Sequence, residues 1–208
     1  MSDRSDEALA RAWASGDLSA GDQLLRRYSG IILRFFRNKV AARDLDDLAQ
    51  KVLEGCVRGI QRFREDAKFS TYLIQIAHNV LVSHYRKQSS RGKVFNDHEL
   101  VQHSVEELRP GLVTMMVAGE QQQLLLAGLR RLPLETQILL ELYYYENKAA
   151  PELSEILDIP LGTVRSRLRR AKAKLQEIIR EVGAEPTLTE STINDLDGWA
   201  RRVRNQMG

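Results

Sequence analysis

A short segment near the C-terminal end concentrates positive charge in a way that suits nucleic-acid binding. Between Arg165 and Lys174 the sequence carries six Lys or Arg residues, and no acidic residue follows until Glu177. Arginine pairs bidentately with guanine edges or with phosphate, and such contacts both position a protein on DNA and read its sequence. The segment therefore predicts a DNA-binding surface.

The spacing around this segment predicts a helix-turn-helix. We expect a short helix to end near Leu157, a tight turn to occupy residues 158–160 and a longer helix to follow. Pro160 suits a helix start, because its missing N–H would be unpaired there anyway. The second helix has an apolar stripe at helical spacing, formed by Val164, Leu168, Ala171, Leu175 and Ile178.

The other faces of this helix carry the candidate contacts to DNA. A helix of this kind lies in or beside a major groove, and its first turn reaches base edges. The candidates are Thr163, Arg165, Ser166, Arg167, Arg169, Arg170 and Lys172. A basic helix that is only solvated is the alternative, but the turn spacing and the uncompensated charge occurring together disfavour it.

Composition limits the class of protein that this chain can be. Its 208 residues suffice for two small domains, and a formal net charge of only +3 means that charge-driven binding needs local segregation. The single cysteine, Cys56, excludes an internal disulfide. No apolar run approaches the roughly 20 residues that cross a bilayer, and the N-terminus is charged rather than signal-like. We therefore expect a cytoplasmic protein without a membrane partner.

Almost all periodicity along the chain is helical, which predicts an all-α fold. Residues 5–40 fit one or two amphipathic helices. Residues 44–63 fit another, with Asp44 as its N-cap. A further helix ends in basic residues at Lys87, and a second helical block follows from about Glu120. These blocks predict two small helical domains.

Two further segments complete this organisation. The polar stretch from Gln88 to about Gly119 contains Pro110-Gly111 and predicts a flexible linker between the domains. After Gly183 we expect a short C-terminal helix with an apolar stripe, which consists of Ile193, Leu196, Trp199, Val203 and Met207.

Two separated sets of motifs resemble bacterial sigma factors of the extracytoplasmic-function group, in the sigma-70 family. The C-terminal set is "LP" before a helix, an E-x-x-x-I-L helix and "GTVRSRL". The N-terminal set is "DLDDLAQKV" followed by "RFREDAKFSTYL". Both occur in the family's order, with a linker between them.

The resemblance implies a two-domain initiation factor that directs core RNA polymerase to promoter DNA. It implies that residues 5–95 are region 2, which binds polymerase and the −10 element. Residues 96–118 would be the linker and residues 119–182 region 4, which reads the −35 element. Residues 183–208 would be a C-terminal extension. We expect no enzymatic activity, no catalytic residues and no cofactor or metal ion.

Within region 2 the resemblance places the −10 contacts on one loop and one helix. Melted DNA is held by stacking and edge contacts to bases, beside cations that hold the backbone. The candidates are Arg64, Lys68, Ser70, Tyr72, Gln75, His78, Asn79, Ser83, Arg86 and Lys87. Asn79 and Ser83 stand where the family has base-contacting side chains. Phe69 and Tyr72 are left open between DNA contact and the core, which is the commoner place for such aromatic residues.

The helix that begins with "DLDDLAQ" is the polymerase-binding element by the same resemblance. Its candidates are Asp44, Asp46, Asp47, Leu48, Gln50 and Lys51. The family usually has an acid where Lys51 stands, and Gly55 and Gly59 follow at four-residue steps. Neutral change or close helix packing is one explanation, and weakened docking to polymerase is the other.

Weakened docking would leave basal activity low until a modification restored negative charge. Phosphorylation of Ser70 or Thr71 by a Ser/Thr kinase is our candidate, because phosphate adds between one and two negative charges. A phosphate close to DNA-facing cations could instead inhibit. The sequence does not decide whether an anti-sigma factor also binds.

Two other classes of protein compete with this interpretation. A conventional helix-turn-helix regulator explains residues 162–174 but leaves the pattern over residues 44–87 unaccounted for. A nucleic-acid enzyme would need a metal site built from acids and histidines, namely Asp44, Asp46, Asp47 and His78 or His84. Acids so close together at a helix start point in different directions, and no zinc-type Cys/His spacing is present.

Overall fold

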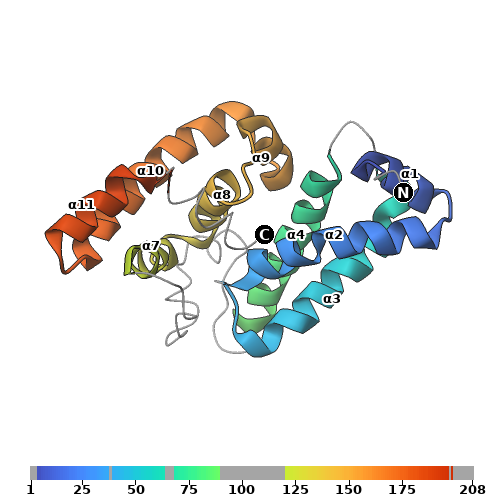
Figure 1. The fold of residues 1–208 in the computed structure, drawn as a ribbon, viewed down its shortest axis with the longest axis horizontal. Helices are drawn as coiled ribbons and strands as arrows, with labels where there is room; N and C mark the ends of the chain where they lie inside the picture. The colour runs from blue at the N-terminus through green and yellow to red at the C-terminus, as the bar shows by residue number, and fades with distance from the viewer. Residues whose placement is uncertain (1–3, 38, 64–67, 90–119, 197, 199–208) are drawn as a thin grey trace. The chain divides into compact units, whose positions relative to one another are not determined.

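The structure is a computed structural model that describes residues 4–37, 39–63, 68–89, 120–196 and 198. Within these ranges all regular structure is helical and no strand occurs, so the predicted all-α class is confirmed. The helices form two compact units, α1 to α4 and α7 to α11 (Figure 1). Among the described helices, none combines the length and the hydropathy that a membrane crossing requires. The predicted linker lies outside the described residues.

The first unit begins with two packed helices, α1 (Asp6–Ala14) and α2 (Leu18–Arg37). The turn between them contains Gly16, whose φ of 102° is a conformation that glycine adopts without strain. The Trp13 ring lies directly over Gly21, where a Cβ atom would come within 2.7 Å of it. The two helices can therefore approach closely at this point.

A cluster of polar contacts joins the start of α1 to the middle of α2. The Asp6 carboxylate accepts hydrogen bonds from Arg27 at 2.8 Å and from the Tyr28 hydroxyl at 2.5 Å. Burial and the neighbouring Asp6 carboxylate raise the pKa of Tyr28 well above its usual value. These contacts make α1 an integral part of the unit.

Helices α3 (Ala42–Gly59) and α4 (Phe69–Ser89) complete the first unit, with a 3-10 turn, η1 (Ile60–Arg62), after α3. The prediction that Asp44 caps α3 is wrong. Ala41 holds the N-cap position and no side chain caps the helix, whereas Asp44 lies in the first turn. A carboxylate in that turn still interacts favourably with the helix dipole. The apolar residues Leu48, Val52 and Cys56 of α3 and Ile60 of η1 are buried at helical spacing.

Close packing against α4 explains the two glycines of α3. A Cβ atom at Gly55 would lie 2.8 Å from Cγ2 of Ile76, and one at Gly59 would collide with the Tyr72 hydroxyl oxygen. Real Cβ atoms do not approach other atoms this closely. Of the explanations considered for these glycines, close helix packing is the one that the structure supports.

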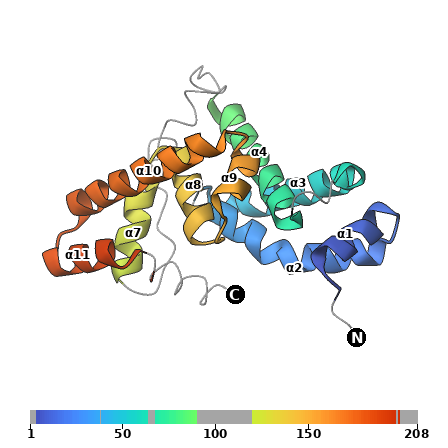
Figure 2. The ribbon, with the colours of Figure 1, turned by 90° about the horizontal axis from the view of Figure 1, so that it is seen from above.

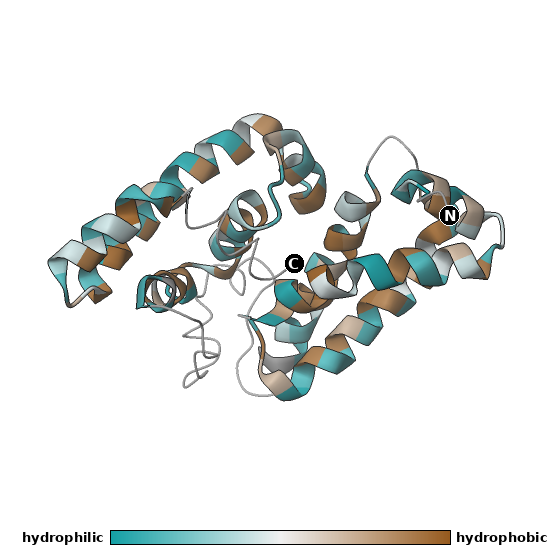
Figure 3. Ribbon diagram, in the orientation of Figure 1, coloured by the Kyte–Doolittle hydropathy of each residue, from teal (hydrophilic) through white to brown (hydrophobic). Residues whose placement is uncertain are grey.

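The second unit contains α7 (Glu120–Arg130), α8 (Leu134–Tyr144), α9 (Ala150–Leu157), α10 (Leu161–Val182) and α11 (Pro186–Asn194). Its core comes from all five helices, and the buried residues include Leu125, Leu129, Ile138, Leu142, Leu153, Ile156, Val164, Leu175 and Ile193. In Figure 3 the apolar residues of α10 gather on the side that faces α7 and α8.

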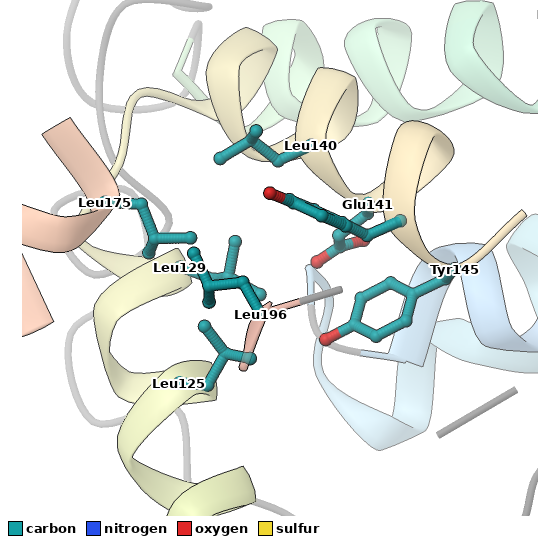
Figure 4. A pocket seen from close by; sticks show the side chains of 8 residues that line it. Leu125, Leu129, Leu140, Glu141, Tyr145, Leu175 and Leu196 are labelled. Atoms are coloured by element: carbon teal, nitrogen blue, oxygen red, sulfur yellow. The ribbon is translucent and has the colours of Figure 1, made fainter. Parts of the chain in front are cut away.

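The C-terminal extension folds back on this unit. Helix α11 packs on α7 and α10 (Figure 2). Gln121 donates to the Ser191 hydroxyl at 2.9 Å, and Arg180 pairs with Glu190 at 3.2 Å. A small cavity of about 10 Å³ is lined jointly by Leu125 of α7 and Leu196 of the extension (Figure 4).

The position of the C-terminal helix differs from the prediction. Helix α11 begins at Pro186, before the predicted stripe, and buries Thr189 and Thr192 beside Ile193. Threonine carries no apolar signal in a hydropathy pattern, so the sequence did not indicate this face. Residues 199–208, which include three members of the predicted stripe, lie outside the described residues.

Candidate nucleic-acid interface

The predicted helix-turn-helix is present in the second unit. Helix α9 ends at Leu157, and Asp158 adopts the left-handed conformation with φ 51° and ψ 48°. Asp tolerates this conformation better than most residues do. The carbonyl oxygen of Pro160, the N-cap of α10, accepts from the backbone of Thr163 at 2.8 Å and of Val164 at 3.0 Å. The turn therefore sets the start of α10 rigidly.

The N-cap of α9 is Ala149, which has no side-chain oxygen to cap the helix. The backbone N–H of Ala149 donates to the Glu152 carboxylate at 2.9 Å, which is half of a capping box. An alanine side chain has no oxygen to make the reciprocal bond, so the first turn of α9 keeps an N–H without a side-chain cap.

The apolar stripe of α10 packs as predicted. Val164, Leu168, Ala171, Leu175 and Ile178 are all buried. Because one face of α10 is fixed in the core, the directions of its other side chains are fixed too. The basic residues of α10 are thus held outside the core in a defined order.

Three arginines of α10 are exposed and have no partner among the described residues, namely Arg165, Arg169 and Arg170. Arg165 and Arg169 are four residues apart, so they lie one above the other on the same face. Guanidinium groups placed in this way can pair with successive phosphates or with a guanine edge. We refer to these three residues as the open arginines.

Two other basic candidates of α10 are tied to α8. Arg167 Nη1 lies 3.0 Å from Glu135 Oε2, and Lys172 Nζ lies 4.4 Å from the centre of the Tyr143 ring. The positive charge of α10 is therefore better compensated than the sequence suggested. Glu135, the partner of Arg167, lies 32 residues earlier in the chain. Local sequence cannot reveal a partner at that separation.

The remaining candidates of the first turn of α10 are partly used within the helix. Thr163 and Ser166 are half-buried, and the Ser166 hydroxyl donates to the Thr163 carbonyl at 2.9 Å. Further along, Lys174 pairs with Glu177 at 2.8 Å. The open arginines therefore dominate the available positive charge of α10.

In the first unit, the structure separates core from surface at the start of α4. Phe69 is fully buried and packs edge-on against Tyr28, with ring centres 5.3 Å apart, so it is a core residue. Tyr72 is half-buried against Phe63 and Phe69, and burial raises its pKa to about 12. Thr71 is only 3% exposed.

The surface of α4 carries most of the other candidates for −10 contact. Gln75, Asn79, Ser83 and Arg86 follow one another at steps of four, four and three residues, which places them on one face of the helix. The exposed candidates are Lys68, Asn79, Ser83, Arg86 and Lys87. The half-buried ones are Ser70, Gln75 and His78. Arg64 lies outside the described residues.

The predicted polymerase-binding residues of α3 do not all face solvent. Asp46, Asp47, Gln50 and Lys51 are exposed, whereas Leu48 is 1% exposed and belongs to the core. The prediction that Leu48 offers its side chain to a partner therefore conflicts with its burial. Lys51 forms an ion pair with the Asp47 carboxylate one turn earlier, which neutralises one acid of this surface.

No metal-binding cluster of three His, Cys, Asp or Glu side chains occurs among the described residues. Asp44 pairs with Arg43 at 3.8 Å, and the acids of α3 are directed apart along the helix.

Comparison with known proteins identifies two separate regions of the chain. Family models of sigma-70 region 2 and of sigma-70, region 4 match residues 22–91 and 122–175. The ECF RNA polymerase sigma-E factor of Haemophilus influenzae is 25% identical over 183 residues, which cover 84% of this chain and 95% of that protein. The protein of the same name from Escherichia coli K12 is 26% identical over 185 residues, which cover 84% and 96%.

A solved structure shares the fold. CnrH, in its structure with the cytosolic domain of CnrY, aligns with a TM-score of 0.61 at 20% identity, over 86% of this chain and 99% of the CnrH chain. The matched region models, in their order along the chain, and the full-length relatives agree with the helix-turn-helix described above. The chain belongs to the sigma-70 family, as an RNA polymerase sigma factor of the extracytoplasmic-function type.

Proposed function

We propose that this sigma factor directs core RNA polymerase to promoters through a division of labour between its two units. The second unit reads the −35 element with α10, and the first unit binds polymerase and the −10 element with α3 and α4. Because its target is the bacterial transcription enzyme, it acts in the cytoplasm. The observation that carries the proposal is the set of open arginines on a helix whose opposite face is locked in the core.

The proposal predicts that the double change Arg165→Ala and Arg169→Ala weakens promoter binding but leaves polymerase binding intact. Each lost phosphate contact lowers the slope of log affinity against log salt by about one, so the slope should fall by about two. The measurement is binding to, and transcription from, a promoter selected from a random library with core polymerase.

A matched control for this experiment is Lys174→Ala. Lys174 is an exposed cation of the same helix, but it is paired with Glu177. We expect it to keep the wild-type slope within experimental error. An unchanged slope for the double arginine variant would contradict the proposal. Absence of transcription with core polymerase alone would favour the conventional regulator instead.

We further propose that an activating phosphorylation, if it occurs at the start of α4, uses Ser70 rather than Thr71. The 3% exposure of Thr71 keeps a kinase from reaching its hydroxyl in the folded chain, whereas Ser70 is half-buried. Retention of the chain on core polymerase, measured before and after kinase treatment, tests this. Equal retention of the two forms would remove the activation hypothesis.

A protein partner that holds the factor inactive also stays a prediction. CnrH was solved with the cytosolic domain of CnrY, and this chain shares its fold. Isolation of the tagged factor from its own cells, with the co-purifying proteins identified, would test for an anti-sigma factor. Recovery of core polymerase alone under all growth conditions would count against one.

A further inference from the structure

Two of the basic residues on α10 reach α8 at opposite ends. Arg167 contacts Glu135 in the first turn of α8, and Lys172 lies over Tyr143 in its last turn. Tyr143 comes eight residues after Glu135 in α8, which corresponds to about 12 Å of helix at 1.5 Å per residue. Two contacts this far apart resist rotation of α10 across α8, which a single contact would allow.

Both contacts restrict the position of α10 more than they stabilise the fold. The Arg167 and Glu135 side chains are 37% and 35% exposed, so solvent screens the pair and it adds little to stability. The planar guanidinium nevertheless restricts the direction of approach. Lys172 lies 5.1 Å from the Tyr144 ring centre as well as over Tyr143, so two rings confine one ammonium group.

We infer that Arg167 and Lys172 are positioning residues, which fix α10 on α8 through Glu135 and the tyrosine pair so that the open arginines meet DNA. The inference rests on the proposed reading of promoter DNA by α10. It changes the assignment of two residues that the sequence placed among the DNA contacts. Of the six cations between residues 165 and 174, three are then open, two are tied to α8, and Lys174 pairs with Glu177 within α10.

The two roles differ in their dependence on salt. A cation that contacts phosphate adds about one to the salt slope of binding, whereas a residue that only positions others changes affinity and leaves the slope intact. Loss of the Arg167–Glu135 pair should therefore weaken binding at every salt concentration by a similar factor.

A charge swap tests the inference with the full-length chain. The probe is a fluorescent duplex of the upstream element that the wild-type factor and core polymerase select from a random library. We expect Arg167→Glu and Glu135→Arg each to weaken binding about tenfold. The chain with both changes should bind within about threefold of wild type, with an unchanged slope. A swap that binds as weakly as Arg167→Glu, or a slope lower by about one, would overturn the inference.

Two milder variants keep the test valid if the swap does not fold. Lys172→Met keeps an unbranched side chain over the tyrosine rings, and we expect an unchanged salt slope. Arg167→Lys keeps the charge but loses the planar group, and we expect weaker binding with the slope retained. A slope lowered by about one in Lys172→Met would show direct contact with DNA.

The same probe separates this inference from the proposed function. If Arg165→Ala with Arg169→Ala leaves the slope unchanged, the promoter-reading role of α10 itself fails. If that double variant behaves as expected but the charge swap does not restore binding, only the positioning role fails.

Discussion

At the scale of single residues, two unexpected glycines in α3 are explained by helix packing. Gly55 and Gly59 follow Lys51 at four-residue steps, so they looked like part of an altered polymerase-docking surface. In the structure they allow α3 to approach Ile76 and Tyr72 of α4. At Gly55, which lies within α3, the cost of a helical glycine, about 1 kcal/mol relative to alanine, is therefore offset by the packing it permits.

Gly55→Ala should destabilise the factor although alanine is the better helix former. The new Cβ would lie 2.8 Å from Ile76 Cγ2, and overpacking of this kind costs about 1–3 kcal/mol. Urea unfolding measures the effect. The control is Gly30→Ala in α2, where the nearest atom is Arg34 Nη1 at 3.5 Å, and we expect stabilisation of up to about 1 kcal/mol. Equal gains at both sites would contradict the close packing of α3 on α4.

At the scale of elements, α11 converts a C-terminal extension into part of the second unit. Its buried face combines Ile193 with two threonines, and Glu190 reaches across to Arg180. The family model of region 4 ends at residue 175, so α11 lies outside the matched part of the chain. It thus adds a fifth packing helix to the helix-turn-helix.

Ile193→Ala should destabilise the second unit by about 2–4 kcal/mol, because the side chain is buried and its removal leaves a cavity. Thermal unfolding followed by circular dichroism measures this loss. Asn194→Ala is the control, since Asn194 is exposed at the other end of the same helix and should change stability little. If Ile193→Ala were as stable as the control, α11 would not be packed in solution.

The N-cap of α11 predicts a pH dependence. The Glu185 carboxylate accepts from the backbone N–H of Leu188 at 2.6 Å and of Thr187 at 3.1 Å, and these bonds lower the pKa of Glu185 below its ordinary 4.5. A lowered pKa in the folded state means that the contribution to stability is complete above pH 4.5. It is lost as pH falls through the folded-state pKa.

Glu185→Gln should therefore lower the melting temperature at neutral pH and weaken its decline on the acid side. Melting curves from about pH 3 to about pH 7 measure both effects, because this range extends to both sides of the ordinary pKa of a carboxylate. Glu190→Gln serves as the comparison, because Glu190 pairs with Arg180 but caps no helix. Parallel acid profiles for wild type and Glu185→Gln would show that the cap does not form.

At the scale of the whole molecule, a net charge of only +3 hides a strong segregation of charge between surfaces. The open arginines occupy one helix of the second unit, and the acids at the start of α3 occupy the first unit. The first unit also carries exposed cations on α4, such as Arg86 and Lys87, so the two signs of charge are divided between helices and not between units. Separate acidic and basic surfaces suit a factor that must hold DNA and a polymerase at the same time. The ion pair of Lys51 with Asp47 reduces the net negative charge of the α3 surface.

Lys51→Glu should raise the affinity for core polymerase several-fold, because it frees Asp47 and puts an acid where the resemblance to the family leads us to expect one. Binding to core polymerase by the full-length factor measures the gain. The slope of binding to the upstream duplex should not change, since α10 is untouched. Lys51→Gln is the control that removes the ion pair without adding an acid. No gain from Lys51→Glu over this control would remove the idea of weakened docking.

The sequence by itself determined the all-α class, the two units and the helix-turn-helix, because helical periodicity and turn residues are local properties. The buried stripe of α10 shows this, since all five of its predicted members are in the core. The tertiary structure alone decided which charges are open, because a partner such as Glu135 for Arg167 stands far away in the chain. It also decided that the glycines of α3 lie against α4 and that two threonines of α11 are buried. Packing between helices depends on which of their surfaces meet in the folded chain.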